Sequence, residues 1–589
     1  MIRATRIHFD ARAKPGRKQQ RSPTIAPRNN LSHVAGEQSE PLLDLTIPQA
    51  LAQAAAMYGD REAAVFCATG TRITYAELDM LVDQLATGFL ELGLEKGDRI
   101  GIWGPNRIEW LVTQFASARL GLILVSINPA YRLMELEYAL NKVECKALVT
   151  ANQFKTSNYI EMIEALAPEI KSSAPGELAA AKLPHLRTVI QMGDEHVPGM
   201  YRYMDIMQNG RLPDKARLDA IGAQLKPTDP INIQFTSGTT GAPKGATLTH
   251  HNILNNSNFT TAVMAYTEQD RVCIPVPLYH CFGMVVGTLG SVTKGSAMIF
   301  PEEAFDPLTT LQAVDRERCT SLYGVPTMFV AELEHPDFAT FDLSSLRTGI
   351  MAGSPCPIEL MKRVIAEMNM SEITIAYGMT EVGPLSFQTS VDDPIEKRVS
   401  SVGRVHPHVE VKIVDADGRT VPVGVEGEIW TASYGVMTGY WNDPERTDEA
   451  MDGGVWMRSG DLGVLDKDGY LNISGRLKDM VIRGGENIFP REIEEFLYRN
   501  PKVQQAQVFG VPDEKYGEEL CAWIELRPGE AASEDEIREF CKGQITHFKI
   551  PRYIRFVEEF PMTVTGKVQK FKMRELMCKE LGLKEQQTA

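Results

Sequence analysis

The chain has 589 residues, of which 43% are hydrophobic and 23% charged, and it carries a formal net charge of −16. This composition is typical of a globular protein, and the length indicates two or more packed units. The negative charge argues against a nucleic-acid partner, which usually requires a basic face. No run of about 18 apolar residues is present, so no transmembrane segment is predicted. Nine scattered cysteines without metal-ligand spacing indicate neither a disulfide framework nor a zinc site.

The N-terminus differs from the rest of the chain. Its first 36 residues carry eight Lys or Arg against one acid, Asp10, so this arm has a charge of +7 and leaves −23 for the remainder. An Arg-rich, acid-poor N-terminus is typical of mitochondrial transit peptides, but serine is scarce here and Pro15-Gly16 interrupts a long amphipathic helix. We expect residues 1–40 to form a basic arm and structure to begin near Pro41. A cytoplasmic location is favoured, with the mitochondrial matrix as the alternative.

Beyond Pro41, short apolar runs alternate with amphipathic segments. Thr74 and Glu77 have the spacing of a capping box, which predicts a helix that continues to Leu92 before Gly93. Apolar runs at 99–103, 122–127 and 147–150 are separated by helical patterns at 108–120 and 134–143. This alternation predicts βαβ units and a mainly parallel sheet, that is, an α/β body.

The pattern changes from about Val409, where short strands are separated by Asp-Gly turns at 417–418, 452–453 and 468–469. Such turns predict an antiparallel, barrel-like portion. After Gly475 a compact α+β pattern follows, with helices at 490–499 and 533–542 and strands at 503–511 and 520–526. We expect a large N-terminal domain over residues 41–475 and a small C-terminal domain over residues 476–589.

A loop rich in glycine and hydroxyl residues follows the predicted strand at 231–235. Its backbone amides and hydroxyls can surround a polyphosphate, and Lys244 can neutralise it. It is not a Walker A loop, because Pro243 precedes the lysine and Gly245 replaces the Ser or Thr that binds Mg²⁺. A flexible linker, the alternative, usually lacks this density of Thr. The candidate phosphate-binding residues are Thr236, Ser237, Gly238, Thr239, Thr240, Gly241 and Lys244.

This loop resembles the signature loop of the adenylate-forming (AMP-binding) superfamily, which includes acyl-CoA synthetases, luciferases and peptide-synthetase adenylation domains. Four further motifs agree with the superfamily in order and spacing: Tyr377-Gly-Met-Thr-Glu381, Ser459-Gly-Asp461, Gly475-Arg-Leu-Lys-Asp479 followed by Gly484-Gly-Glu-Asn487, and Pro561-Met-Thr-Val-Thr-Gly-Lys567. Within the superfamily, the stretches 231–247, 277–283, 352–357 and 568–575 resemble the medium-chain fatty acyl-CoA synthetase branch, which would place the chain in fatty acid metabolism.

The resemblance implies the adenylate-forming enzyme fold, in which the small C-terminal domain is mobile, and a two-step use of ATP, Mg²⁺ and coenzyme A. A carboxylate attacks the α-phosphate, pyrophosphate leaves, and the acyl group then moves to a thiol. Because two anions meet, the site needs cations and oriented donors more than a base. By resemblance Lys567 bridges the carboxylate and the α-phosphate, Glu381 holds Mg²⁺, and Thr380 donates its hydroxyl to the α-phosphate.

Other nucleotide contacts also follow from the resemblance. Tyr377, next to Gly378, is expected to stack on adenine, with Gly353 and Ser354 along the same ring. Asp461 is expected to accept hydrogen bonds from the ribose hydroxyls, although an Asp in a Gly-Asp turn is also an ordinary turn residue. Arg476 is expected to contact ribose or phosphate.

Lys478 occupies the position of the superfamily's hinge. The C-terminal domain is implied to rotate there between half-reactions. One orientation brings Lys567 to the α-phosphate, and the other opens an approach for the thiol of coenzyme A along Gly484, Gly485 and Glu486.

The acid substrate is predicted from the stretch 278–287, which contains no carboxylate that would pair with the ammonium of an amino acid. The expected acyl-pocket residues are His280, Phe282, Gly283, Met284, Tyr323 and Gly324. The glycines, including Gly287, are expected to leave space for a chain. A lone histidine is more often simply hydrogen-bonded within the fold. Chain length stays open, because a pocket methylene contributes only about 1–3 kcal/mol.

Several alternatives remain open at this point. An aryl, branched or sulfur-containing acid is the alternative to a medium-chain fatty acid. A luciferase-like monooxygenase would adenylate its substrate and then oxidise it. A carrier-loading enzyme would need a separate carrier protein, since no carrier-like D-S-L motif is present. The sequence also leaves open a homodimer.

Overall fold

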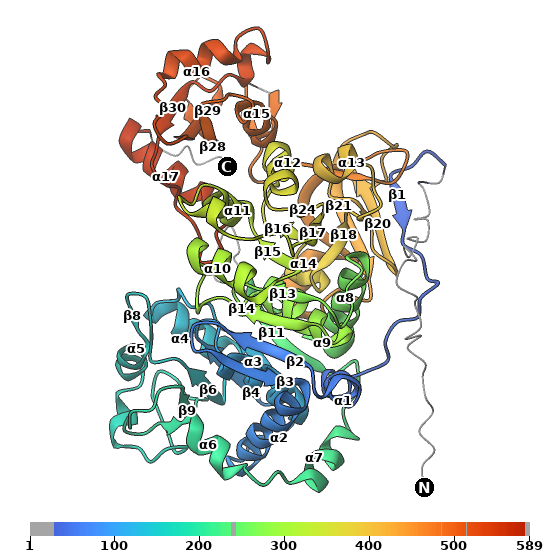
Figure 1. Cartoon of the computed structure of the whole chain (residues 1–589). Helices are drawn as coiled ribbons and strands as arrows, with labels where there is room; N and C mark the ends of the chain where they lie inside the picture. Colours follow the sequence, from blue (N-terminus) through green and yellow to red (C-terminus); the bar gives the residue numbers. More distant parts are fainter. Residues whose placement is uncertain (1–26, 28, 237–242, 485, 514, 584–589) are drawn as a thin grey trace.

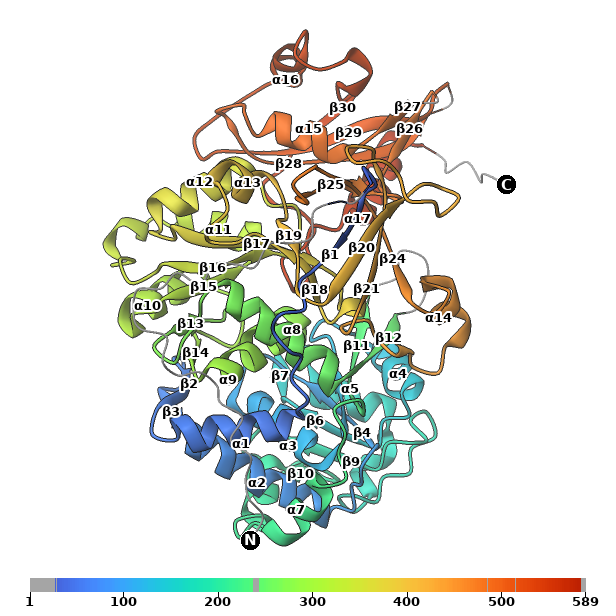
Figure 2. The ribbon, with the colours of Figure 1, turned by 90° about the vertical axis from the view of Figure 1, so that its right-hand side faces the viewer.

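The computed structural model describes residues 27, 29–236, 243–484, 486–513 and 515–583. Ser237, Gly238, Thr239, Thr240, Gly241 and Gly485 lie outside the described residues. Figures 1 and 2 show a large N-terminal body of two mixed sheets and one antiparallel sheet, with a smaller C-terminal domain at one end of the molecule. The predicted α/β class, with a large and a small domain, is therefore confirmed.

Both large sheets are parallel at their centres and antiparallel at one or both edges. The nine-stranded sheet has the order β19 (Arg404–Val405), β18 (Leu385–Gln388), β17 (Glu372–Gly378), β16 (Thr348–Ala352), β15 (Ser321–Gly324), β13 (Arg271–Cys273), β14 (Ala297–Phe300), β2 (Glu62–Phe66) and β3 (Thr71–Thr74). The eight-stranded sheet has the order β10 (Tyr201–Arg202), β9 (Thr188–Gln191), β6 (Ala147–Thr150), β4 (Arg99–Trp103), β5 (Ile123–Ser126), β11 (Pro230–Thr236), β12 (Lys244–Thr249) and β22 (Gly439–Tyr440).

Helices cover these sheets and α8 lies between them (Figure 1). Their bounds are α1 Ile47–Tyr58, α2 Tyr75–Glu91, α3 Ile108–Leu120, α4 Leu133–Lys142, α5 Tyr159–Leu166, α6 Tyr203–Asn209, α7 Lys215–Gly222, α8 His250–Val263, α9 Gly290–Lys294, α10 Pro307–Glu317, α11 Pro326–Leu333, α12 Ile358–Glu367, α13 Ile395–Ser400 and α14 Pro444–Ala450. The capping box is formed as predicted: the Glu77 amide donates to Thr74 Oγ1 at 3.2 Å, and the Thr74 amide donates to Glu77 Oε2 at 2.8 Å.

The antiparallel sheet comprises β1 (His33–Ala35), β20 (Val409–Val414), β21 (Gly427–Ser433), β24 (Trp456–Leu465), β23 (Met451–Asp452) and β25 (Leu471–Arg476). Strand β1 corrects the expectation that structure begins near Pro41 and that residues 1–40 form one arm. Val34 is 1% exposed, and β1 pairs antiparallel with β20. A three-residue strand carries no readable alternation, and its place in the sheet comes from a partner almost four hundred residues away.

The C-terminal domain has a five-stranded sheet of β27 (Glu486–Ile488), β26 (Val481–Arg483), β29 (Gly517–Leu526), β28 (Val503–Asp513) and β30 (Tyr553–Phe556). Its helices are α15 (Pro490–Leu497), α16 (Glu534–Cys541) and α17 (Lys570–Leu581). Two apolar clusters of its own, one around Val508 and Ile524 and one around Trp523 and Met573, give this domain a separate core. No helix among the described residues is both long and apolar enough to cross a bilayer.

A buried acid lies in α11, beside the second apolar cluster of the large domain. Glu332 is 1% exposed, and neither carboxyl oxygen has a hydrogen-bond partner among the described residues. Burial raises the pKa of Glu332 well above its ordinary value of 4.5. The folded protein therefore keeps a proton that the unfolded chain releases, so stability falls as the pH rises from the unfolded pKa toward the folded one.

We predict that Glu332→Gln removes this loss of stability, because an amide does not ionise. The advantage of the variant in free energy of unfolding should grow by about 1.4 kcal/mol per pH unit above the unfolded pKa, until the folded pKa is reached. Urea unfolding between about pH 5 and about pH 8 measures this. Glu359→Gln, at an exposed position of α12, is the control. Parallel pH profiles for wild type and Glu332→Gln would contradict the assignment.

Candidate active site

The candidate site lies at the carboxyl ends of parallel strands from both large sheets. Strand β11 ends at Thr236, β16 leads into Gly353, and β17 ends at Gly378 just before Glu381. In open α/β sheets, ligands bind in the crevice outside these strand ends. The motif residues, separated by up to about 330 positions, therefore reach one region because the strands share a direction.

Glu381, which follows β17 of the nine-stranded sheet, is 5% exposed and is held by two residues of the eight-stranded sheet. Its Oε1 accepts hydrogen bonds from the hydroxyls of Tyr440 at 2.8 Å and Thr236 at 3.2 Å. Lys244 Nζ lies 4.4 Å from the centre of the Tyr440 ring, within the range of a cation–π contact. Tyr440 was not found by sequence reasoning, because a lone aromatic in a Gly-Tyr-Trp stretch carries no motif signal.

Mg²⁺ usually binds one or two carboxylates together with substrate phosphates and water, not a cage of protein ligands. The described residues contain no cluster of three or more His, Cys, Asp or Glu that would form such a cage. Glu381, anchored beside the loop that begins at Thr236, has the donor chemistry for a phosphate-bridged Mg²⁺.

Tyr377, Asp461 and Arg476 form a connected group. Tyr377 OH donates to Asp461 Oδ2 at 2.8 Å, and Arg476 Nε lies 3.0 Å from Asp461 Oδ1. Burial, followed by the charge of Asp461, raises the pKa of Tyr377 well above its ordinary value, so the phenol stays a donor. The two contacts orient the Asp461 carboxylate. A group that accepts hydrogen bonds from two neighbouring hydroxyls needs such a fixed orientation. Stacking of the Tyr377 ring on adenine stays a prediction.

The loop that ends in Lys567 docks against the N-terminal domain. Thr327 Oγ1, at the start of α11, donates to the Gly566 carbonyl at 3.1 Å. Gly566 has φ +76°, and a Cβ there would lie 2.8 Å from Val325 Cγ2, so only glycine fits this approach. Lys567 Cε lies 3.4 Å from the position a Cβ on Gly353 would take. The lysine therefore lies directly over the segment that contains Gly353 and Ser354.

The electrostatics of the site follow from that docking. Burial, followed by the charge of Arg476, lowers the pKa of Lys567 to about 8, while Cys281, Asp461 and Glu381 act in the opposite direction. Lys567 is thus still mostly a cation at neutral pH. Burial, with a smaller contribution from Lys567, lowers the pKa of His280 to about 3, so His280 is neutral. The charge of Lys567, in the C-terminal domain, therefore affects the pKa of His280, in the N-terminal domain.

The predicted acyl-pocket residues are only partly together. The rings of Phe282 and Tyr323 stack with centroids 5.5 Å apart. Phe282 begins a π-helix (Phe282–Leu289), a rare geometry that often occurs at functional sites. Met284 is 1% exposed and belongs to the core, with Sδ 3.8 Å from Gln234 Nε2.

The expectation that glycines leave space for the chain was wrong. A Cβ on Gly283 would lie 2.4 Å from the Pro277 carbonyl oxygen, and one on Gly324 would lie 2.9 Å from the Phe329 ring. A Cβ on Gly287 would lie 3.2 Å from Ile274. These glycines permit close packing of backbone and side chains, which sequence reasoning does not separate from an open slot.

The residues predicted to form the hinge and to contact coenzyme A lie on the C-terminal side of the site. Lys478 is exposed between β25 and β26, the last strand of the large domain and the first strand in the sheet of the small one. Gly484 ends β26 with φ +60°, and its amide donates to the Tyr516 carbonyl at 2.8 Å. Glu486 is exposed at the start of β27, while Gly485 lies outside the described residues.

The chain is similar to known proteins over both domains. Residues 51–441 match the AMP-binding enzyme family, and residues 492–567 match the AMP-binding enzyme C-terminal domain. The chain is 47% identical over 565 residues to a Danio rerio protein named medium-chain acyl-CoA ligase ACSF2, mitochondrial, covering 95% of this chain and 93% of that protein. It is 48% identical over 547 residues to the putative acyl-CoA synthetase YngI of Bacillus subtilis (strain 168), covering 93% and 100%.

The crystal structure of the anthranilate CoA ligase AuaEII with anthranoyl-AMP superposes with a TM-score of 0.82 at 26% identity, covering 93% of this chain and 99% of that one. The chain therefore belongs to the AMP-binding enzyme family and has the adenylate-forming fold. The resemblance read from its five motifs is confirmed at the level of the family.

We predict that the rate of adenylate formation falls as the pH rises through about 8, because Lys567 then loses the charge that faces the substrate. Lys567→Arg should shift this loss to higher pH, since a guanidinium stays protonated. Exchange of labelled pyrophosphate into ATP, followed from about pH 6 to about pH 10, measures it. A falling limb at the same pH in Lys567→Arg would assign the titration to another group.

We predict that Glu381→Gln raises the Mg²⁺ concentration needed for half-maximal adenylation by at least about tenfold, because an amide keeps the shape but loses the charge. Glu372→Gln, at the other end of β17, removes the same charge away from the site and serves as the control. An unchanged Mg²⁺ dependence in Glu381→Gln would exclude Glu381 as the ligand.

Proposed function

We propose that this enzyme joins a carboxylic acid to coenzyme A with ATP, by way of an acyl-adenylate, and releases AMP and pyrophosphate. The observation that carries the proposal is the position of Lys567 over Gly353, which the hydrogen bond between Thr327 and Gly566 fixes. The charges of Asp461 and Glu381 act on Lys567 there and favour its protonated form. A cation there faces the point where a carboxylate and an α-phosphate must approach. The large domain, from β1 to residue 475, and the small domain, residues 476–589, then act as the two domains of the reaction.

In the first half-reaction, a carboxylate oxygen attacks the α-phosphorus and the bond to the β-phosphate breaks, so pyrophosphate leaves. Lys567 offsets the charge that gathers on the α-phosphate, and Thr380 can donate to the same group. Asp461, oriented by Tyr377 and Arg476, holds the ribose hydroxyls. Bound Mg²⁺, held by Glu381, would neutralise charge on the departing phosphates.

In the second half-reaction the sulfur of coenzyme A attacks the acyl carbon, the thiol proton is lost, and AMP leaves. Lys567 has no role in this step, so the C-terminal domain can turn at Lys478. The Gly484–Glu486 segment then forms part of the approach for the thiol. Without rotation, the Lys567 loop would continue to occupy its place against Gly353.

We propose a medium-chain fatty acid as the substrate, because the relatives whose names state a chain length, at 45–47% identity, are medium-chain acyl-CoA ligases. The apolar rings of Phe282 and Tyr323 suit an uncharged acyl group. An aryl acid is the second candidate, since the superposed AuaEII structure contains anthranoyl-AMP. A mitochondrial location, as in the name of the Danio rerio relative, is the alternative to a cytoplasmic one.

The test is AMP release with ATP, Mg²⁺ and a panel of straight-chain and aryl acids, with and without coenzyme A. We expect release that depends on coenzyme A and is largest with medium-chain acids. Lys567→Ala should abolish pyrophosphate exchange while sparing thioester formation from supplied acyl-adenylate. Equal loss of both steps would contradict the role of Lys567, and light emission or oxygen uptake would favour the luciferase-like alternative.

A further inference from the structure

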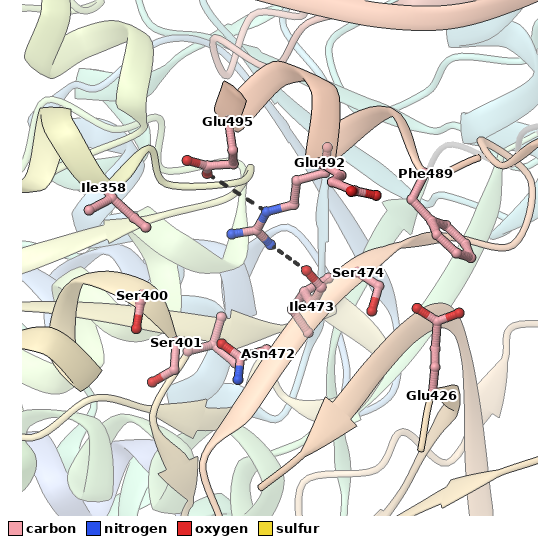
Figure 3. A pocket seen from close by; sticks show the side chains of 12 residues that line it. Ile358, Ser400, Ser401, Glu426, Asn472, Ile473, Ser474, Phe489, Glu492 and Glu495 are labelled. Atoms are coloured by element: carbon pink, nitrogen blue, oxygen red, sulfur yellow. Dashed lines mark hydrogen bonds and ion pairs between the residues drawn. The ribbon is translucent and has the colours of Figure 1, made fainter. Parts of the chain in front are cut away.

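The C-terminal domain also contacts the N-terminal domain away from Lys567, along one side of α15. A cavity of about 350 Å³ lies there, between the start of α12, the end of α13, β25 and α15 (Figure 3). Most of its lining residues are polar or charged, among them Ser400, Asn472, Glu426 and Glu495. The domains therefore meet here through separate polar contacts around a space, not through a packed apolar core, and such an interface can open at low cost.

Arg491 in α15 makes the first of these contacts. Its Nη1 donates to the carbonyl oxygen of Ile473 at 2.9 Å, and its Nε lies 3.9 Å from Glu495 Oε1; Figure 3 shows both as dashed lines. Ile473 belongs to β25 and precedes Lys478, whereas Arg491 follows it. Rotation of the C-terminal domain at Lys478 must therefore break the bond between Arg491 and Ile473.

Glu495 lies on the same side of α15 and lines the cavity together with Ile358, the first residue of α12. That helix begins after Pro357, which provides no side-chain cap for the first amides. Burial raises the pKa of Glu495, while Arg491 and a hydrogen bond from the backbone amide of Ile358 act in the opposite direction. A carboxylate at a helix N-terminus is stabilising. Glu495 thus places a carboxylate of the C-terminal domain beside the uncapped start of α12.

Helix α12 is connected to the segment that contains Gly353 and Ser354. The chain runs from β16 through Gly353 and Ser354 to Pro357 and then into α12. Lys567 lies over Gly353 at the other end of this short connection. The same orientation of the C-terminal domain therefore places Glu495 beside the start of α12 and Lys567 over the segment that precedes this helix.

We propose that Arg491 and Glu495 form a releasable interdomain latch, which favours the orientation with Lys567 in the site and so sets the partition between the two half-reactions. This inference rests on the proposed two-step function. Arg491 and Glu495 are positioning residues: they act through the orientation of the domain, not on the reacting atoms.

The latch makes a quantitative prediction. If the two half-reactions use two orientations, the ratio of their rates follows the ratio of the two populations. A hydrogen bond to a charged group is worth enough that its loss shifts such an equilibrium by roughly tenfold. Glu495→Ala and Arg491→Ala should therefore each raise the ratio of thioester formation to adenylate formation by about tenfold. Glu495→Gln, which keeps an acceptor for the Ile358 amide, should lie between Glu495→Ala and wild type.

The experiment uses the full-length enzyme with octanoic acid and octanoyl-adenylate as probes. Pyrophosphate exchange measures the first half-reaction, and conversion of supplied octanoyl-adenylate to octanoyl-CoA measures the second. Glu492→Ala is the matched control, because Glu492 lies on the same helix and its carboxylate pairs with Lys549 within the C-terminal domain, 2.7 Å away. Thermal unfolding of each variant tests folding, and a folding defect would lower both rates without changing their ratio.

An unchanged ratio in both Arg491→Ala and Glu495→Ala, or an equal change in Glu492→Ala, would overturn the latch. Failure of the proposed function is distinguishable from this result. If the wild-type enzyme performs neither half-reaction with any acid, the proposed function is wrong. If it performs both and the ratio does not respond to α15, only the latch is wrong.

Discussion

A lysine must keep its charge while it is enclosed between two domains, and the rest of the site depends on this. Enclosure removes water from Lys567 and lowers its pKa, and the neighbouring Arg476 lowers it further. Asp461 and Glu381 oppose both effects, so the ammonium remains largely protonated at neutral pH. Tyr377 orients one of these carboxylates and Tyr440 the other. The charged groups are therefore arranged around a cation that the C-terminal domain supplies.

The proposed rotation of the C-terminal domain constrains the interface. The C-terminal domain has its own apolar clusters, and its described contacts with the large domain include single hydrogen bonds and ion pairs at Thr327, Ile473 and Glu334. An extensive apolar interface would hold Lys567 in the site, but it would make separation of the two domains costly. Polar contacts, each weak in water, allow the same surface to be made and broken within one catalytic cycle.

Sequence reasoning failed where distant segments decide the outcome. Strand β1 depends on β20, which the chain reaches almost four hundred residues later. The sequence predicts open space beside Gly283 and Gly324, but Pro277 and Phe329 fill that space. Tyr440 and Thr327 belong to no motif, and each matters only because another segment places a carboxylate or a carbonyl beside its hydroxyl. Such contacts leave no periodicity and no local pattern.

By itself, the sequence determined the α/β class, the bounds of segments such as α3 and β6 to within a residue, and the family. These follow from local rules, namely capping, apolar periodicity and motifs in a set order, which need only neighbouring residues. Only the tertiary structure decided which carboxylates act on Lys567, how its charge is balanced, and which contacts α15 makes with the large domain. Electrostatic and interdomain effects depend on distances through space, and those distances exist only after the strands have been ordered into sheets.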